Sequence, residues 1–291
     1  MTKYPRIAII GLGEVGSVFA AALVEQGVPL AVGSRPSQKS MASAARLGLA
    51  LDHDLARVAR GADVVLLTTT GEGLRDVVAT VAPALAPHAL LADLTAAATA
   101  QVVVAADSLG AARARYVDVA IMGAASLHGL EVPLLASGPS ASGLAEILNP
   151  LGFRVSARTA SAVGDASRLK LLRSLFAKGL DAVVVESMVA AEALGLRGAL
   201  VDLLADFDQR PLRDHIEMYL RTHPVHAARR LVEMELAEAE LLELRLPSLT
   251  TRATIDRYRR TVESSSRLDL PTGALDADTA ARWLLEAEKR A

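Results

Sequence analysis

Three glycines near the N-terminus have the spacing Gly-x-Gly-x-x-Gly, at positions 11, 13 and 16. The apolar run from Ile7 to Ile10 precedes them, and a segment of helical character from Ser17 to Leu23 follows. In this context the first glycine makes a tight turn, the second lets a pyrophosphate approach the backbone, and the third lets helix meet strand. An ordinary glycine-rich turn is the alternative. We predict a dinucleotide site at Gly11, Leu12, Gly13, Glu14, Val15 and Gly16.

The segment from Gly33 to Lys39 indicates which dinucleotide binds. A site for NAD usually carries Asp or Glu about 20 residues after the glycines, whereas an arginine accommodates the 2′-phosphate of NADP. This segment contains no acid, and Ser34, Arg35 and Lys39 can donate hydrogen bonds to a phosphate or pair with it. We predict NADPH or NADP as the cofactor in preference to NAD, with a solvated basic loop as the alternative.

Two threonine-bearing loops are expected beside the nicotinamide. They follow the apolar runs that end near residues 68 and 94, and ligands of open α/β sheets lie outside the carboxyl ends of the strands. Thr69, Thr70 and Thr95 would offer hydroxyls to the carboxamide and ribose. The alternative is that threonine is simply a good strand residue.

The segment from Ser161 to Leu194 is predicted to form one long helix, because it is rich in Leu, Val and Ala. Its polar residues follow steps of three, four and seven positions and share one face: Ser167, Lys170, Ser174 and Asp181. Lys178 lies one position beside this row. A water-facing row is the ordinary interpretation, and a row that carries chemistry is the alternative.

The elements that would position these residues alternate along the first half of the chain. From residue 6 to about 154, short β-branched runs alternate with segments of helical length, which is the pattern of βαβ units. Strands are expected at 6–10, 30–33, 63–68, 90–94, 115–120 and 134–137. The remainder is helical, with breaks at Gly195, Pro211, Pro224, Pro247 and Pro271. We predict an α/β Rossmann-type, doubly wound parallel sheet over 1–158 and an all-helical domain for substrate binding or dimerisation over 159–291.

Composition excludes several other classes of protein. The 291 residues are 52% hydrophobic, carry a formal charge of −2 and include no cysteine. Such a chain buries a core, and its charge gives no general attraction to nucleic acid or anionic lipid. The longest stretch without Asp, Glu, Lys or Arg, between Asp76 and Asp93, is shorter than the ~20 residues of a membrane helix. We expect a cytoplasmic protein with no nucleic-acid or membrane partner, in a reducing compartment that suits the absence of cysteine.

Several segments together resemble the β-hydroxyacid dehydrogenase family, which includes hydroxyisobutyrate, tartronate-semialdehyde and 6-phosphogluconate dehydrogenases. They are the glycine turn and the segments 93–95, 118–123 and 164–170, in order along nearly the whole chain. The resemblance implies a general acid/base lysine on the long interdomain helix, at the position of Lys170. It also implies a substrate loop at Met122 and Gly123, and a second site residue at Ser174.

The chain also departs from the family pattern. The Ser-Gly-Gly substrate loop reads Met122-Gly123-Ala124, the second glycine before the lysine is Ala166, and the usual asparagine is Ser174. The segments from Ser167 and His226 are more similar to an uncharacterised phosphogluconate-dehydrogenase-like branch with a shorter helical C-terminal domain. This branch has no single known substrate, so the resemblance does not identify one.

Other charged residues have weaker patterns. Arg173, Arg229 and Arg230 could each bind a carboxylate or phosphate of an acidic substrate, although solvated helix arginines are the simpler interpretation. We expect no metal site at His223 and His226, because no thiolate is present and Pro224 interrupts the geometry of the helix. A leucine-rich face suggests a homodimer contact: Leu236, Leu241, Leu242 and Leu244.

The sequence therefore predicts an NADPH-dependent oxidoreductase that moves a hydride between nicotinamide and a small, acidic carbonyl or hydroxy compound. Burial would have to lower the pKa of Lys170 from the ordinary lysine value before its amine could exchange protons near neutral pH. An imine reductase is the closest alternative, although that related group typically carries Asp or Tyr in place of the lysine. A catalytically silent NADPH-binding sensor or interaction protein is the alternative from another class.

Overall fold

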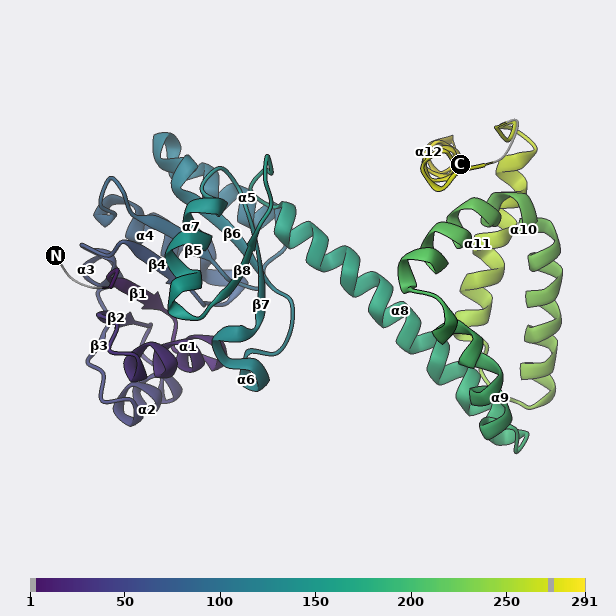
Figure 1. Cartoon of the computed structure of the whole chain (residues 1–291), viewed down its shortest axis with the longest axis horizontal. Coiled ribbons are helices and arrows are strands. Elements are labelled where there is room, and N and C mark those ends of the chain that lie inside the picture. Colours follow the sequence, from purple (N-terminus) through teal and green to yellow (C-terminus); the bar gives the residue numbers. More distant parts are fainter. Residues whose placement is uncertain (1–3, 272–274, 291) are drawn as a thin grey trace. The chain divides into compact units, whose positions relative to one another are not determined.

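The computed structural model describes residues 4–271 and 275–290. The chain divides into two compact units, the first covering residues 1–174 and the second 175–291 (Figure 1). Helix α8 (Asp165–Ala193) contributes its first residues to the first unit and the rest to the second. The functional division at residue 158 stays a prediction.

The first unit is built on an eight-stranded sheet with the order β3-β2-β1-β4-β5-β6-β7-β8. Neighbouring strands are parallel except β6 and β7, which run antiparallel. The predicted α/β class with a mostly parallel Rossmann-type sheet is confirmed. The strands are β1 (Ile7–Ile10), β2 (Leu30–Gly33), β3 (Leu51–Asp52), β4 (Val64–Leu67), β5 (Leu90–Asp93), β6 (Tyr116–Ile121), β7 (Pro133–Ser137) and β8 (Arg154–Ala157).

The two outer strands β3 and β8 are missing from the sequence prediction. Strand β3 has only two residues, too few for a periodic signal. Strand β8 has an exposed arginine and an exposed serine at alternate positions, as expected for an edge strand with one wet face.

Helices cover both faces of the sheet because its central strands are apolar on both sides. In β1, Ile7 and Ile9 pack in one core cluster with α1 and α7, whereas Ala8 and Ile10 pack in the other with α3, α4 and α5. The helices of the first unit are α1 (Glu14–Glu25), α2 (Gln38–Arg46), α3 (Leu55–Ala59), α4 (Leu74–Val81), α5 (Thr99–Asp107), α6 (Ala125–His128) and α7 (Ala141–Leu148).

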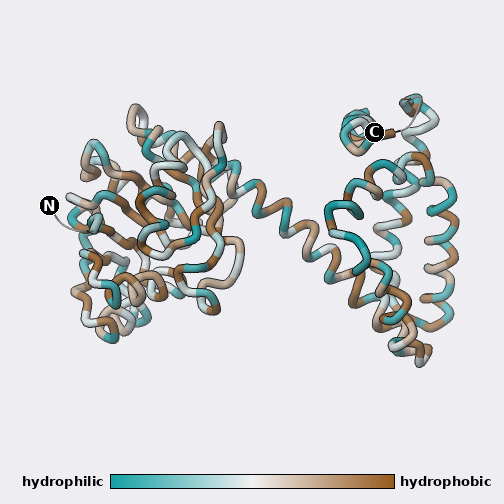
Figure 2. Tube along the Cα trace, viewed as in Figure 1, coloured by the Kyte–Doolittle hydropathy of each residue, from teal (hydrophilic) through white to brown (hydrophobic). Residues whose placement is uncertain are grey.

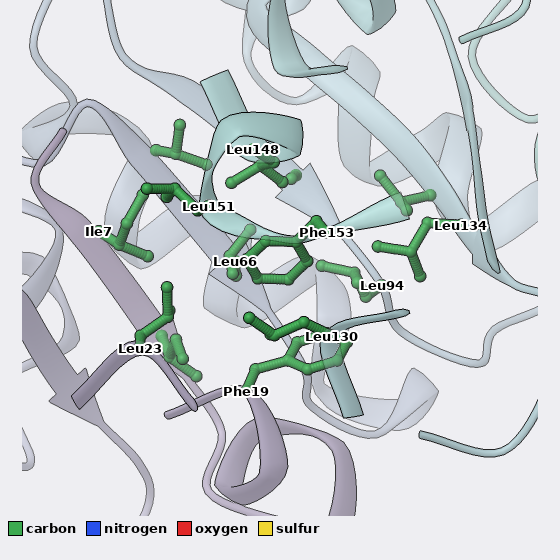
Figure 3. Packing of buried hydrophobic residues seen from close by; sticks show 14 of the residues in the cluster. Ile7, Phe19, Leu23, Leu66, Leu94, Leu130, Leu134, Leu148, Leu151 and Phe153 are labelled. Carbon is green, nitrogen blue, oxygen red and sulfur yellow. The ribbon is translucent and has the colours of Figure 1, made fainter. Parts of the chain in front are cut away.

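The first of these clusters joins residues from the beginning and from the end of the sequence of the sheet domain (Figure 3). Phe19 of α1 meets Phe153, which precedes β8, edge to face with ring centroids 5.2 Å apart. Leu66 of β4 and Leu148 of α7 belong to the same cluster. The helix that follows the glycine turn is therefore fixed against the core over its apolar face.

The second unit is helical. It contains the remainder of α8 with α9 (Arg197–Leu204), α10 (Leu212–Glu243), α11 (Leu249–Ser265) and α12 (Ala277–Arg290). Glu186 of α8 accepts hydrogen bonds from the backbone N–H groups of Thr250 and Thr251 and from the Thr251 hydroxyl. This carboxylate caps α11 and ties it to α8. The predicted all-helical C-terminal region is confirmed.

Helix α10 runs through Pro224, so the predicted break at this proline is wrong. A proline in a helix interior costs about 3 kcal/mol because it removes one hydrogen bond and crowds the preceding turn. Pro224 and Ala227 are buried in the second unit, where α10 packs along α11 and α12. We attribute the continued helix to this packing. No described helix combines the length and the apolarity that a membrane crossing requires.

Candidate functional site

A cavity of about 410 Å³ opens at the carboxyl ends of β1, β2 and β4 in the first unit. Strand order reverses at β1, which lies between β2 and β4, and open α/β sheets bind ligands at this point. The lining includes most of the predicted cofactor residues: Gly11, Leu12, Gly13, Glu14, Val15, Ser34, Arg35, Lys39, Thr69 and Thr70. The fold therefore brings together the glycine turn expected to bind the pyrophosphate and the basic segment expected to bind the 2′-phosphate.

The three glycines of the turn differ in what surrounds them. Gly11 has φ +107°, and a Cβ there would lie 2.6 Å from the Thr68 carbonyl oxygen. At Gly16 a Cβ would lie 1.9 Å from the Gly11 carbonyl oxygen, so helix and strand touch backbone to backbone. At Gly13 nothing lies within 4 Å of that position. Gly11 and Gly16 are thus required by the fold, whereas Gly13 leaves open space above the backbone.

That open space lies at the start of α1. Gly13 is the N-cap of α1, and no side chain caps the first turn of this helix. Free N–H groups and the positive end of the helix dipole favour an anion there. The turn therefore has the bare backbone and the unpaired donors that a dinucleotide pyrophosphate needs.

The segment after β2 is held by local hydrogen bonds. His53 Nδ1 lies 2.8 Å from the Ser34 carbonyl oxygen, and the Ser34 hydroxyl donates to the Arg35 carbonyl oxygen at 3.0 Å. Ser37 caps α2 by accepting from the Ser40 backbone N–H at 3.1 Å. The side chains of Arg35 and Lys39 are exposed at the cavity. They add two positive charges next to a helix N-terminus. In the described part of the chain, neither side chain forms an ion pair with a carboxylate.

A run of contacts leads from this cavity toward the middle of the sheet. The hydroxyls of Thr69 and Thr95 lie 3.4 Å apart, and Thr95 donates its backbone N–H to Asp93 at 2.9 Å. Thr95 is buried and does not line the cavity itself. Asp93 also accepts a hydrogen bond from the Tyr116 hydroxyl. Burial raises the pKa of Asp93 to about 6, opposed by these hydrogen bonds and reinforced by the negative charge of Asp118.

Asp118 is the partner of Asp93 in the register of β5 and β6, and it fixes the start of α8. Its buried carboxylate accepts four hydrogen bonds, from the Ser137 hydroxyl, the Gly164 N–H, and the N–H and hydroxyl of Ser167. The Ser137 hydroxyl in turn accepts from the Ala166 N–H at 2.9 Å. Side chains from two strands thus satisfy the free N–H groups of the first turn of α8.

Lys170 lies three residues beyond Ser167 on this helix and is half-buried. Burial lowers the pKa of the Lys170 amine below its ordinary value, while the nearby Asp118 carboxylate opposes the change. The next site candidate, Ser174, is half-buried, and Arg173 is exposed. Neither Lys170 nor these two residues line the 410 Å³ cavity.

The predicted substrate loop lies outside that cavity as well. Met122 is half-buried and donates its backbone N–H to the Pro133 carbonyl oxygen at 2.8 Å, and Gly123 is exposed. The cavity is also lined by residues that the sequence did not point to: Ile10, Pro36, Ser37, Ser40, Leu55, Gly73 and Val77. Ser37 could have been found from the sequence, because it precedes a helical segment by one residue and fits the N-cap rule.

Residues 6–151 match the family described as the NAD binding domain of 6-phosphogluconate dehydrogenase. This chain belongs to that family. Its NAD binding domain contains the glycine turn, the segment after β2 and both Asp93 and Asp118. Residues 191–261, in the second unit, match a domain of unknown function named DUF1932. The resemblance to 6-phosphogluconate dehydrogenase inferred from the motifs is confirmed.

Solved structures extend the comparison over the whole chain. A conserved hypothetical protein from Sinorhizobium meliloti 1021 is 28% identical, with 100% of this chain and 98% of that chain covered and a TM-score of 0.62. A conserved protein of unknown function, described as structurally similar to 3-hydroxyacid dehydrogenases, is 25% identical over 89% of this chain and 98% of its own, with a TM-score of 0.62. An imine reductase variant from Myxococcus stipitatus in complex with NAD+ is 19% identical, covers 98% and 100%, and has a TM-score of 0.73, which shows a shared fold.

The remaining candidates lie in the second unit. His223 Nε2 is 2.9 Å from the Thr261 hydroxyl, and the His223 ring stacks on Tyr258. No cluster of His, Asp or Glu suited to a metal ion occurs among residues 4–271 and 275–290. Arg229 pairs with Glu233, and Arg230 donates to the Thr222 hydroxyl. The four leucines do not form one face, since Leu241 is buried whereas Leu236 and Leu242 are exposed.

Proposed function

We propose that this protein is an NADPH-dependent oxidoreductase that interconverts a small carbonyl compound and the corresponding hydroxy compound. The observation that carries the proposal is the convergence, in one cavity, of an open glycine turn and an acid-free basic segment. The family match supports a nicotinamide cofactor, and the resemblance to hydroxyacid dehydrogenases supports the reaction class.

The residues of the cavity suit the two phosphate-bearing parts of NADPH. The uncapped first turn of α1 and the bare backbone at Gly13 would hold the pyrophosphate. Ser34, Arg35 and Lys39 would hold the 2′-phosphate through charge-assisted hydrogen bonds. The basic segment supports NADPH over NADH, because NADH has a hydroxyl where NADPH has a phosphate and would leave two cations without a partner.

Lys170 is the proposed proton donor and acceptor. When bound, NADPH supplies the hydride to the carbonyl carbon, and NADP accepts it in the reverse direction. Lys170 Nζ gives a proton to the substrate oxygen during reduction and takes it back during oxidation. The lowered pKa of this amine and its half-buried position suit the role. Ser174, one helical turn further, would orient the same oxygen.

An acidic substrate is the proposed class, because Arg173 is exposed on α8 one residue before Ser174 and has no ion pair in the described part of the chain. A guanidinium binds a carboxylate with two parallel hydrogen bonds. Met122 and Gly123, after β6, would complete the substrate loop that the family resemblance implies.

The test is oxidation of NADPH, followed by absorbance, against a panel of aldehydes, keto acids and cyclic imines. We expect turnover with carbonyl compounds, fastest with those that carry a carboxylate. Turnover of imines alone would favour an imine reductase. Tight NADPH binding without turnover of any substrate would favour a sensor, and either result would contradict the proposal.

We also propose that the protein is a homodimer in the cytoplasm, a reducing compartment that suits a chain without cysteine. Within the second unit, α8 exposes a series of apolar side chains: Leu175, Phe176, Leu180, Val183, Val184, Val185 and Val189. Apolar segments recur along this helix (Figure 2). A further apolar cavity of about 620 Å³ lies among α8, α9, α10 and α11. Large apolar side chains exposed in this number on one helix are typical of an interaction surface, and a second copy would cover them.

A further inference from the structure

Gly73 lies between β4 and α4, where it is the N-cap of α4 and lines the nucleotide cavity. Its backbone has φ −97° and ψ 0°, which residues with side chains also adopt. The conformation at this position therefore does not require a glycine. Another reason for the absent side chain must be sought in what surrounds it.

A side chain at position 73 would meet Arg35. A Cβ there would lie 2.9 Å from Nη2 of Arg35 and 3.3 Å from both Cζ and Nη1. These three atoms belong to one planar guanidinium, so this group lies across the bare Cα of Gly73. Even one methyl group at position 73 would push the guanidinium away, because 2.9 Å is well inside the ordinary contact distance between such atoms.

The rest of Arg35 is held more firmly than its guanidinium. Its carbonyl oxygen accepts hydrogen bonds from the hydroxyls of Ser34 and Ser40, and Pro36 restricts its backbone to extended conformations. The guanidinium itself makes no hydrogen bond or ion pair within the described residues. Its resting position is therefore set by packing on Gly73 and not by a polar partner.

We infer that Gly73 is a specificity-determining residue that lets the Arg35 guanidinium rest at the nucleotide cavity, where it selects NADPH over NADH. The inference rests on the proposed function, in which Arg35 binds the 2′-phosphate. NADH lacks that phosphate, so its affinity does not depend on the position of the guanidinium. Gly73 would thus act on cofactor choice without touching the phosphate itself.

The first experiment compares Gly73→Ala with the wild-type protein by fluorescence titration with NADPH and with NADH. We expect the Kd for NADPH to rise about 10-fold, the size of one weakened charge-assisted hydrogen bond, and the Kd for NADH to stay within about 2-fold. The thermal unfolding midpoint should fall only slightly, because the three atoms nearest to the new methyl group all belong to the movable end of the Arg35 side chain. Gly179→Ala in α8 is the matched control, since a Cβ there meets nothing within 4 Å.

The second experiment repeats Gly73→Ala in an Arg35→Ala background. If Gly73 acts through Arg35, the added substitution changes neither Kd further, and the two effects are strongly non-additive. An equal loss of affinity for both cofactors in the single variant would overturn the inference. So would an unchanged Kd for NADPH, or additive effects in the double variant. If Arg35→Ala alone leaves the NADPH affinity unchanged, the proposed cofactor preference fails first, and the role of Gly73 falls with it.

Discussion

Asp118 of β6 and Ser167 of α8 form two hydrogen bonds, from the serine hydroxyl to Oδ1 at 2.7 Å and from the serine N–H to Oδ2 at 3.0 Å. The carboxylate belongs to the dinucleotide-binding sheet, and the serine stands one turn before Lys170. A strand of the cofactor domain therefore fixes both the depth and the rotation of the helix that carries the proposed acid/base residue.

Replacing Asp118 with Asn should loosen the start of α8. The amide keeps the size of the side chain but loses its charge and one acceptor, which leaves buried N–H or hydroxyl donors without partners. We expect the free energy of unfolding to fall by about 2 kcal/mol. Urea denaturation followed by circular dichroism measures this loss. The rate of backbone amide hydrogen exchange should rise in the peptide that covers residues 162–170.

The control for this variant is Asp107→Asn, which alters an exposed carboxylate paired with Arg113. It should leave both the denaturation curve and the exchange of residues 162–170 unchanged, because exposed ion pairs contribute little. If Asp118→Asn also left both unchanged, the Asp118 carboxylate would not be what holds the start of α8.

Two substitutions in the glycine turn should separate cofactor binding from folding. Gly13→Ala places a methyl group in open space, with φ −74° at that residue, so the fold is kept while the methyl group meets the incoming pyrophosphate. Gly16→Ala forces a Cβ to within 1.9 Å of a backbone oxygen and should destabilise the first unit by about 3 kcal/mol or more. NADPH titration and thermal unfolding of both variants test this. Equal effects of the two changes on both measurements would contradict the assignment.

Asp93 should make stability depend on pH between about 4 and 6. Its pKa rises from 3.8 in the unfolded chain to about 6 in the folded one, so the folded state binds the extra proton in this window. The stability that this proton gives is complete below the unfolded pKa and is lost as pH rises through about 6. Asp93→Asn does not ionise. It keeps an oxygen for the Thr95 N–H, and its amide N–H can donate to the Tyr116 hydroxyl, which would then accept.

We therefore expect Asp93→Asn to flatten the pH dependence and to exceed the wild-type stability at pH 8 by about 1 to 3 kcal/mol. Urea denaturation at pH 5 and at pH 8 provides the comparison. If the stability of the wild-type protein and that of the variant changed equally between pH 5 and pH 8, Asp93 would not be the group responsible.

Lys170→Ala should keep NADPH binding and lower turnover by at least about 100-fold, the lower end of what one acid/base group supplies. Because the acid form is needed for carbonyl reduction, the reduction rate should fall as pH rises through the lowered pKa of Lys170, and the oxidation rate should rise over the same range. Steady-state kinetics in both directions measure this. Lys178→Ala, on the exposed part of the same helix, is the control. Normal turnover in Lys170→Ala would remove this residue from the mechanism.

Local sequence patterns predicted many of the elements of this fold. They could not predict contacts between segments that are distant in the sequence. The glycine turn, six of the strands and α8 each have a signal within about ten residues, since periodicity and capping are local. Asp93 and Asp118 come together only through the register of β5 and β6, which depends on pairing across the sheet. The contact of Arg35 with Gly73 joins residues that no local spacing relates. The course of α10 through Pro224 depends on packing against two other helices.

The apolar surface of α8 leads to a prediction about assembly. Leu180 is 53% exposed, so a charged residue at this position costs the isolated chain little. In a dimer that covers this surface, Leu180→Glu would bury an unpaired carboxylate and shift the equilibrium to monomers. Sedimentation velocity at micromolar concentration should show the wild-type protein at twice the 30.5 kDa chain mass and the variant at the chain mass. Gln209→Glu adds the same charge at an exposed polar position and should stay dimeric. A monomeric wild-type protein would contradict the proposed homodimer.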